Sequence, residues 1–445
     1  MSEQKKTLSL VLPIGLMLFS FFFGAGNFIF PPILGQMSGS NLVPAIIGFC
    51  ISGVGLPLLG ILAMAVSRSD NPDSMAEPVH PRYARALTVI CALTIGPFFA
   101  IPRTAAVSFE TGILPFIPQG SETAGLLVYS VFFFILTYFL SVRPSKLVDN
   151  IGKYLTPMLL ICLGILIFCV FKNPMGEIGA PRGEYVVNPM FMGLQHGYQT
   201  MDLLCALLFG AATVNAIIGK GVESQQQLTR ICIYAGCLAA SCLAIIYSAL
   251  AYTGASSVSL LGYFSTGSIL LNHVATHYMG DFGKVVLALI IFFACLTTSI
   301  GVASSISGYF AAMFNGRVQY QRLILLICVF SCAVSNFGLS KIIEYSIPVI
   351  CILYPIIIAI VILNIARPII KGDKLVFRIC MTLTTCFAVF DGLRAAGIDT
   401  GAVNVLLARI IPYYEIGFGW ILPCFGGIFL GLACRMLQKL AAAKA

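Results

Sequence analysis

In the stretch Phe19-Ser-Phe-Phe-Phe-Gly-Ala-Gly-Asn-Phe-Ile-Phe-Pro-Pro32, a Gly-Ala-Gly-Asn segment interrupts an otherwise apolar run. The run extends from Leu8 to Leu34 and is long enough to span a membrane. Two glycines weaken a helix, and the amide of Asn27 finds no hydrogen-bond partner in lipid. Irregular backbone is tolerated at membrane depth only where protein buries it or where it lines a watery cavity. The stretch therefore predicts either a broken helix whose freed N–H and C=O groups bind a polar solute, or a span bent for close packing against a neighbouring helix.

The composition places the rest of the chain in the membrane as well. Of the 445 residues, 59% are hydrophobic and only 10% are charged, and the mean hydropathy is +0.96. This balance is typical of an all-α polytopic membrane protein and excludes a soluble domain. We expect about 12 transmembrane helices of bilayer-spanning length, near residues 9–35, 42–66, 87–112, 123–141, 151–171, 196–218, 229–254, 283–312, 322–338, 342–365, 375–391 and 414–434.

The charge distribution gives the expected orientation. The net charge of +9 is compatible with nucleic-acid binding, but most of the 26 Lys and Arg residues fall in segments on the same side as the N-terminus. This asymmetry follows the positive-inside rule, so we expect both termini in the cytoplasm and no nucleic-acid partner. The 16 Cys residues all fall within expected spans, which argues against a disulfide framework and against a metal-binding cluster.

Several ionisable residues fall within the predicted spans, where such side chains are costly. Arg103 either lines the permeation path or its gate, or ties to backbone carbonyls or to a carboxylate, and Glu110 lies two turns further on the same helical face. Asp202 either belongs to a functional site or forms a salt bridge, for example with Arg103. Glu344 and Asp391 lie near the expected membrane edges, where a carboxylate reaches water, so we expect little from them.

The eighth predicted span is rich in hydroxyl side chains and contains Ala294-Cys-Leu-Thr-Thr298. Hydroxyls in a membrane helix usually bond back to their own backbone. The alternative is that Thr297 and Thr298 offer oxygen ligands to a hard cation. The residues alone leave both interpretations open.

The two polar interruptions occupy corresponding positions in the chain. One lies in the first span, and the other, around Asp202, lies five spans later in the opposite orientation. Paired interruptions of this kind indicate a transporter binding site between inverted repeats. We therefore expect a cytoplasmic N-terminus (1–8), a first five-helix repeat (9–171), an external loop (172–195), a second, inverted five-helix repeat (196–365), two additional helices (366–434) and a cytoplasmic C-terminus (435–445).

Several separate motifs now carry a family resemblance, and they occur in order along the full length of the chain. They are Phe23-Gly-Ala-Gly-Asn-Phe-Ile-Phe-Pro-Pro32, Gly96-Pro97 through Pro102-Arg-Thr-Ala105 to Val107-Ser-Phe-Glu110, Gly197-Tyr198 with Thr200-Met-Asp202, and Leu296-Thr-Thr298. Together they resemble the bacterial branched-chain amino acid:cation symporters, the BrnQ-type system II carriers. The resemblance implies uptake of leucine, isoleucine and valine across the bacterial cytoplasmic (inner) membrane, driven by sodium or protons. It also implies a LeuT-like fold, with an inverted 5+5 helix repeat and two extra helices.

The resemblance further implies positions for the ion and the substrate. Gly24-Ala-Gly-Asn-Phe28 and Ala294-Cys-Leu-Thr-Thr298 resemble the first-helix and eighth-helix motifs of LeuT-like proteins. A sodium ion would then bind the carbonyls of Ser20, Phe23 and Ala294 and the hydroxyls of Thr297 and Thr298. The expected substrate-binding residues are Gly24, Ala25, Gly26, Asn27, Asp202 and Phe209, with Arg103 and Glu110 in gating or structural roles.

These observations favour a secondary active transporter for branched-chain amino acids. A zwitterion needs a cationic partner, an anionic partner and an apolar slot, and half-helix N-termini after Gly26 can hold its carboxylate. The sequence predicts Na⁺ as the coupling ion, with proton-coupled symport of the same substrates, or transport of another neutral amino acid, as alternatives. It disfavours a passive channel, which needs a pore lined by repeated carbonyls or charges, and an intramembrane enzyme, since it has no catalytic motif within a span. Beyond the lipid bilayer it implies no obligate protein partner.

Overall fold

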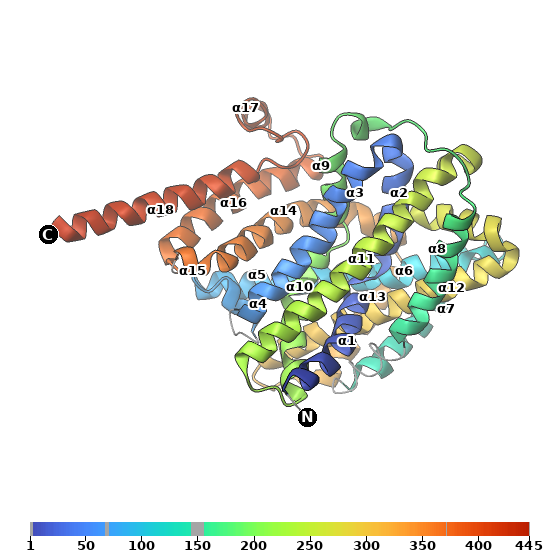
Figure 1. The fold of residues 1–445 in the computed structure, drawn as a ribbon, viewed down its shortest axis with the longest axis horizontal. Coiled ribbons are helices and arrows are strands. Elements are labelled where there is room, and N and C mark those ends of the chain that lie inside the picture. Colours follow the sequence, from blue (N-terminus) through green and yellow to red (C-terminus); the bar gives the residue numbers. More distant parts are fainter. Residues whose placement is uncertain (1–2, 67–70, 144–154, 371, 445) are drawn as a thin grey trace.

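The computed structural model describes residues 3–66, 71–143, 155–370 and 372–444, and throughout these ranges the regular structure is helical (Figure 1). The α-helices, in chain order, are α1 (Glu3–Phe22), α2 (Ala25–Ser38), α3 (Leu42–Cys50), α4 (Leu56–Val66), α5 (Pro81–Leu93), α6 (Ala100–Gly112), α7 (Glu122–Ser141), α8 (Thr156–Lys172), α9 (Pro189–Tyr198), α10 (Asp202–Gly219), α11 (Gln225–Leu261), α12 (Gly267–Met313), α13 (Tyr320–Ser335), α14 (Leu339–Ile365), α15 (Arg367–Ile370), α16 (Lys374–Ala395), α17 (Ala402–Ile410) and α18 (Ile421–Lys444). Two short π-helical segments follow α3 and α5: η2 (Ile51–Gly55) continues into α4, and η4 (Thr94–Phe98) leads to α6. The short 3₁₀ helices are η1 (Gly39–Asn41), η3 (Pro72–Met75), η5 (Leu114–Phe116) and η8 (Gly183–Val186).

The all-α polytopic membrane fold expected from the composition is confirmed. Among the described residues, nine helices are long and apolar enough to cross a membrane. Of three shorter apolar helices, 9–22 covers the first half of the predicted first span, and 156–172 and 320–335 correspond to the predicted fifth and ninth spans. The expected start of the fifth span at residues 151–154 lies outside the described residues.

The first span is broken, not merely bent. Helix α1 ends at Phe22 and α2 begins at Ala25, because Gly24 adopts an extended conformation with φ −121° and ψ −157°. The break therefore consists of Phe23 and Gly24, at the start of the Gly-Ala-Gly-Asn segment, and Gly26 and Asn27 belong to the first turn of α2. The sequence predicts a half-helix that begins after Gly26; in the structure this half-helix, α2, already begins at Ala25.

The sixth span is broken in the same way. Helix α9 ends at Tyr198 and α10 begins at Asp202, and Met201 between them has the left-handed conformation with φ 66°. Helix α9 starts at Pro189, within the stretch 172–195 that the sequence assigns to an external loop. Proline is favoured at the first helical position, because its missing N–H is not needed there. In space, α1 packs against α10 and α2 packs against α9, so the two breaks lie side by side.

Glycines bring α2 and α11 into direct backbone contact. A Cβ atom on Gly35 would lie 1.8 Å from the carbonyl oxygen of Ala251, and a Cβ atom on Gly254 would lie 1.9 Å from that of Pro32. Small residues at a helix interface allow this close approach in membrane proteins. Helix α2 is therefore fixed along much of its length against α11.

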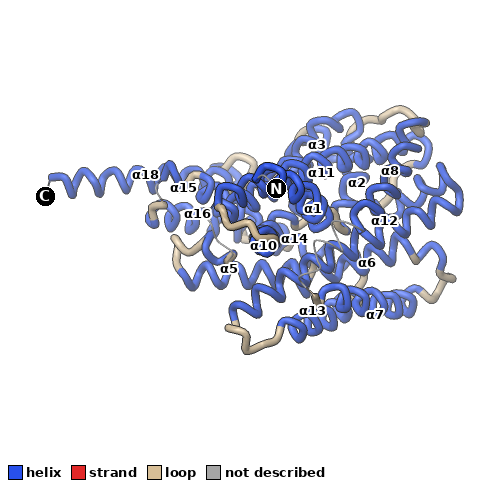
Figure 2. Tube along the Cα trace, turned by 60° about the horizontal axis from the view of Figure 1, so that its bottom comes forward, coloured by secondary structure: helices blue, strands red, loops and turns tan. Residues whose placement is uncertain are grey.

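The last helices stand at one side of the bundle. Helix α16 packs against both α14 and α18, and α18 extends away from the rest of the molecule in both views (Figures 1 and 2). The expectation that Asp391 reaches water is wrong: this α16 residue is only 2% exposed, whereas Glu344 is exposed. The segment before α18 covers Asp391, and a Cβ atom on Gly419 would lie 3.3 Å from its Oδ1.

Candidate functional site

Asn27 joins the two helix breaks. Its side-chain Nδ2 donates hydrogen bonds to Oδ2 of Asp202 and to the hydroxyl of Tyr247, both at 2.5 Å. Its Oδ1 accepts a hydrogen bond from the backbone N–H of Gly24 at 3.3 Å, within the break itself. Asn27 and Asp202 are 2% and 3% exposed. The amide that has no partner in lipid is thus satisfied by three groups from α10, α11 and its own break.

Asp202 lies at the N-terminus of α10. A carboxylate is stabilised there by the positive end of the helix dipole and by the unpaired N–H groups of the first turn. The hydroxyl of Thr200 accepts a hydrogen bond from the Asp202 N–H at 3.4 Å and donates one to the carbonyl of Gly197 at 2.7 Å. The break in the sixth span therefore holds the acid close to the centre of the bundle.

Arg103 caps the other side of the sixth-span break. Its Nη1 donates to the carbonyl of Gln199 at 2.7 Å and its Nη2 donates to the carbonyl of Thr200 at 3.2 Å. These carbonyls follow the C-terminus of α9, where a helix leaves acceptors unpaired and favours positive charge. Of the alternatives left open by the sequence, the geometry shows the tie to backbone carbonyls.

Arg103 also approaches the first-span break. A Cβ atom on Gly26 would lie 2.8 Å from its Nη2, and the guanidinium lies 5.6 Å from the ring centre of Phe30. Only a residue without a side chain fits at position 26 while the guanidinium stays where it is. Glu110, in contrast, lies away from this site: it accepts a hydrogen bond from Thr266 at 3.5 Å and lines a separate cavity of about 730 Å³.

The residues expected to hold a cation form a cluster of uncharged oxygens where α1 crosses α12. The hydroxyl of Thr297 donates to the carbonyls of Ala294 (3.0 Å) and Ser20 (3.4 Å). The hydroxyl of Thr298 donates to the carbonyls of Ser20 (3.1 Å) and Phe21 (3.3 Å). Carbonyl and hydroxyl oxygens are the ligands that hard cations prefer. The donor set therefore fits a cation such as Na⁺.

Gly24 allows α1 and α12 to come this close, because a Cβ atom there would lie 2.7 Å from Oγ1 of Thr298. Ser20 is anchored from a third helix, since its hydroxyl is hydrogen-bonded to that of Thr156 at 2.6 Å. Phe23, the remaining expected ligand residue, lies in the break, and its ring stacks on Tyr247 with centroids 6.3 Å apart. The carbonyl of Phe21 and the hydroxyl of Thr156 join the cluster without having been expected from the sequence.

Phe209 closes the site towards the end of the bundle where the chain begins. It lies about two turns beyond Asp202 on α10, and its ring centroid is 4.8 Å from that of Phe21 and 5.4 Å from that of Phe22. Beyond this aromatic layer is a cavity of about 860 Å³ between α1, α10 and α12, which we call the N-side cavity. Phe21 belongs both to the aromatic layer and to the cavity wall.

Two buried tyrosines complete the site and were not expected as site residues. The hydroxyl of Tyr247 on α11 receives the hydrogen bond from Asn27, and that of Tyr354 on α14 receives one from the N–H of Leu203 at 3.3 Å. The ring of Tyr354 stacks on Tyr198 with centroids 4.4 Å apart. The signal for them in the sequence is weak, because each shares its apolar span with at least one other tyrosine and nothing local distinguishes it.

Solved structures that are similar to this chain share its fold. Mhp1, a nucleobase-cation-symport-1 family transporter, aligns over 97% of this chain and 93% of its own, with a TM-score of 0.63 and 11% sequence identity. MhsT, solved in complex with L-phenylalanine, aligns over 96% and 98%, with a TM-score of 0.57 and 14% identity. Both are LeuT-fold transporters, so the expected LeuT-like fold class is confirmed.

Sequence comparison gives the family. A branched-chain amino acid permease, BrnQ, of Bacillus subtilis is 42% identical over 429 residues, which cover 96% of this chain and 97% of that relative. The branched-chain amino acid transport system 3 carrier protein of Pseudomonas aeruginosa is 36% identical over 430 residues, covering 97% and 96%. The family model described as "Branched-chain amino acid transport protein" matches residues 7–438. The chain therefore belongs to the branched-chain amino acid transport protein family.

Proposed function

We propose that this protein imports leucine, isoleucine and valine by symport with Na⁺, through alternating access to a site at the two helix breaks. The observation that carries the proposal is the contact between Asn27 and Asp202, which brings the breaks of the first and sixth spans together in the centre of the bundle. The relatives named as branched-chain amino acid permeases support the choice of substrate.

The site offers the groups that a zwitterion requires. The first-turn N–H groups of α2, at Ala25 and Gly26, have no acceptor within the helix and bind the substrate carboxylate with the help of the helix dipole. Asp202, at the start of α10, binds the ammonium group. The rings of Phe22 and Phe209 provide an apolar surface for the branched side chain. Arg103 holds the carbonyls of the sixth-span break in place while the substrate binds.

The oxygen cluster at the crossing of α1 and α12 is the proposed sodium site. It contains no fixed charge, so the ion contributes the positive charge that favours entry of the substrate carboxylate nearby. The cluster is built from the last turn of α1, and its occupancy therefore stabilises the arrangement of the first-span break. This shared element links ion binding to substrate binding.

The N-side cavity is the proposed exit path. The excess of Lys and Arg on the side of the N-terminus supports a cytoplasmic position for both termini, and with that orientation the N-side cavity opens to the cytoplasm. The aromatic layer of Phe21, Phe22 and Phe209 separates this cavity from the pair of Asn27 and Asp202. Opening this layer while the opposite side is closed gives access from one face at a time.

A proton is the second candidate for the coupling ion. The observation that favours it is Asp202, a buried carboxylate at the junction of the breaks.

Leucine uptake into proteoliposomes, driven by an imposed sodium gradient or by an imposed pH gradient, distinguishes sodium coupling from proton coupling. Uptake that follows the sodium gradient supports the proposal. Uptake that is independent of sodium, follows the pH gradient and is lost in Asp202→Asn would show that the coupling ion is the proton. Absence of leucine uptake and counterflow under all gradients would contradict transport of leucine.

The double substitution Thr297→Val and Thr298→Ala tests the sodium site. It removes both hydroxyls with little change in volume, and each hydroxyl–oxygen interaction is worth about 0.5–1.5 kcal/mol. We expect the sodium concentration that gives half-maximal leucine uptake to rise by about tenfold or more. Thr276→Val, which removes a hydroxyl from a distant part of α12, is the control. An unchanged sodium requirement in the double variant would show that sodium binds at another site.

A further inference from the structure

The N-side cavity has a mixed lining. One part of its wall is apolar and includes Met17, Phe21 and Leu208. Another part carries charged and hydroxyl groups, including Asp73 and Arg85. An acid, a base and an apolar wall around one cavity of about 860 Å³ form an environment suited to a small amphiphilic zwitterion.

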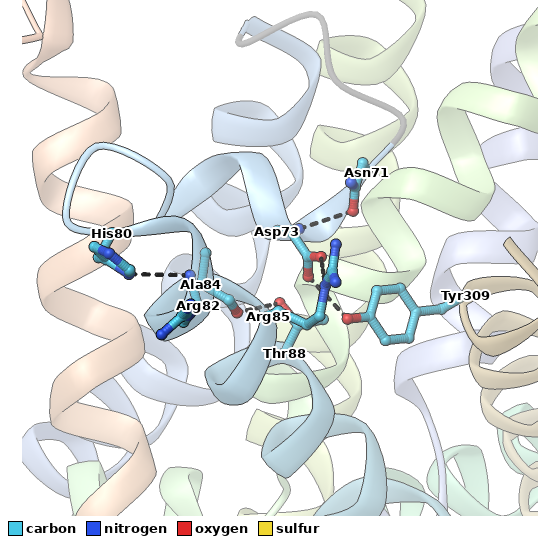
Figure 3. Close-up of polar contacts among 8 residues, drawn as sticks. All are labelled: Asn71, Asp73, His80, Arg82, Ala84, Arg85, Thr88 and Tyr309. Atoms are coloured by element: carbon cyan, nitrogen blue, oxygen red, sulfur yellow. Dashed lines mark hydrogen bonds and ion pairs between the residues drawn. The ribbon is translucent and has the colours of Figure 1, made fainter. Parts of the chain in front are cut away.

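Asp73 is held rigidly in the cavity wall. Its Oδ1 accepts a hydrogen bond from the hydroxyl of Tyr309 on α12 at 2.9 Å, and its N–H donates to Oδ1 of Asn71 at 3.0 Å (Figure 3). The turn that follows is pinned as well, because Nδ2 of Asn364 on α14 donates to the carbonyl of Met75 at 2.8 Å. Asp73 is only 8% exposed although it lies in a connecting segment. The carboxylate is thus a fixed part of the cavity and not a solvated loop charge.

Arg85 is the loosely held partner. Its Nε lies 3.9 Å from Oδ2 of Asp73, and its side chain is 69% exposed. Such an ion pair contributes little to stability, because the exposed guanidinium remains solvated. Arg85 can therefore exchange Asp73 for another carboxylate at small cost, and a guanidinium binds a carboxylate with two parallel hydrogen bonds.

We infer that the N-side cavity contains a second amino-acid position, an exit site in which Asp73 binds the ammonium group and Arg85 binds the carboxylate. The aliphatic side chain lies against the wall formed by Met17 and Phe21. Phe21 also belongs to the aromatic layer that borders the substrate site at the two helix breaks, which we call the central site. A substrate that passes this layer therefore reaches the exit site directly. This inference rests on the proposed transport of branched-chain amino acids.

The chain offers matched controls for both charges. Glu77 belongs to the same connecting segment as Asp73 but is exposed and does not line the cavity, so Glu77→Gln is the control for Asp73→Asn. Arg82 lies one turn before Arg85 on α5 and away from Asp73 (Figure 3), so Arg82→Gln is the control for Arg85→Gln.

The test is leucine counterflow measured from each face of the membrane, in right-side-out and inside-out vesicles. We expect Asp73→Asn and Arg85→Gln to raise the half-saturating leucine concentration about tenfold on the face where the N-side cavity opens. On the opposite face the value should stay within about twofold, because the central site is unchanged. The two controls should match the unmodified protein on both faces. Equal changes on both faces, or no change on either, would overturn the exit site, whereas absence of counterflow in the unmodified protein would overturn the transport function itself.

Two probes separate the roles of the charges. Isopentylamine lacks the carboxylate of leucine, and 4-methylpentanoate lacks its ammonium group. Each probe is added on the membrane face where the N-side cavity opens, and its inhibition of leucine counterflow is measured. The amine should lose potency in Asp73→Asn only, and the acid should lose potency in Arg85→Gln only. Potencies that do not change in either variant would contradict the assignment. If Asp73→Asn does not reach the membrane, Tyr309→Phe decides, because it keeps the charge but frees the carboxylate: it should raise the same half-saturating concentration about threefold, and no change would overturn the site.

Discussion

Gly26→Leu should abolish leucine uptake while the protein still inserts into the membrane. Any Cβ atom at position 26 would lie 2.8 Å from Nη2 of Arg103, and a leucine side chain would displace the guanidinium from the carbonyls of Gln199 and Thr200. It would also cover the N–H groups at the start of α2 that we propose for the substrate carboxylate. A displacement of about 1 Å in a preorganised site can cost a factor on the order of 100 in rate, so we expect uptake to fall at least that far.

Gly164→Leu is the matched control for this prediction. Gly164 lies on α8, and a Cβ atom there would have no heavy atom within 4 Å. The control should insert and transport normally. The measurement is initial leucine uptake in proteoliposomes, normalised to the amount of inserted protein. Normal uptake by well-inserted Gly26→Leu would show that the substrate does not bind at the first-span break.

Asp202→Asn should reduce uptake far more than Glu344→Gln. Asp202 accepts the hydrogen bond from Asn27 at the junction of the breaks, whereas Glu344 is exposed on α14. A hydrogen bond to a charged group is worth about 1.5–3 kcal/mol, which corresponds to a loss of roughly 10- to 150-fold in leucine affinity if Asp202 binds the ammonium group.

Half-saturating leucine concentrations for the two variants, measured side by side under the same sodium gradient, check this expectation. Membrane insertion should be equal in both. If both variants lose activity equally, or if only Glu344→Gln loses it, Asp202 does not bind the substrate and the central site must be assigned again.

The helix breaks could be predicted because their causes are local. Glycines and an amide within a long apolar run have few explanations at membrane depth, and an acid at the corresponding position of the sixth span repeats the pattern. The exact point of the first break could not be predicted. It depends on the Asn27 side chain, which accepts a hydrogen bond from the N–H of Gly24 and donates hydrogen bonds to Asp202 and Tyr247 on distant helices.

Long-range partners account for the other differences. Arg103 is costly in a span, but whether it pairs with Asp202 or with carbonyls depends on where the C-terminus of α9 lies, almost a hundred residues away. Asp391 was expected near water because it lies near the end of a span; the segment before α18 buries it, and no local pattern indicates that contact. In each case a partner distant in sequence determines the outcome.

The backbone contact between α2 and α11 has a mechanical consequence. With Gly35 against Ala251 and Gly254 against Pro32, neither helix can slide or rotate on the other without a steric clash. The two helices therefore form one rigid strut. Helix α1 continues into this strut through Phe23 and Gly24, and it also packs along α11. A swing of α1 away from α10 must therefore either part α1 from α11 or carry the strut with it.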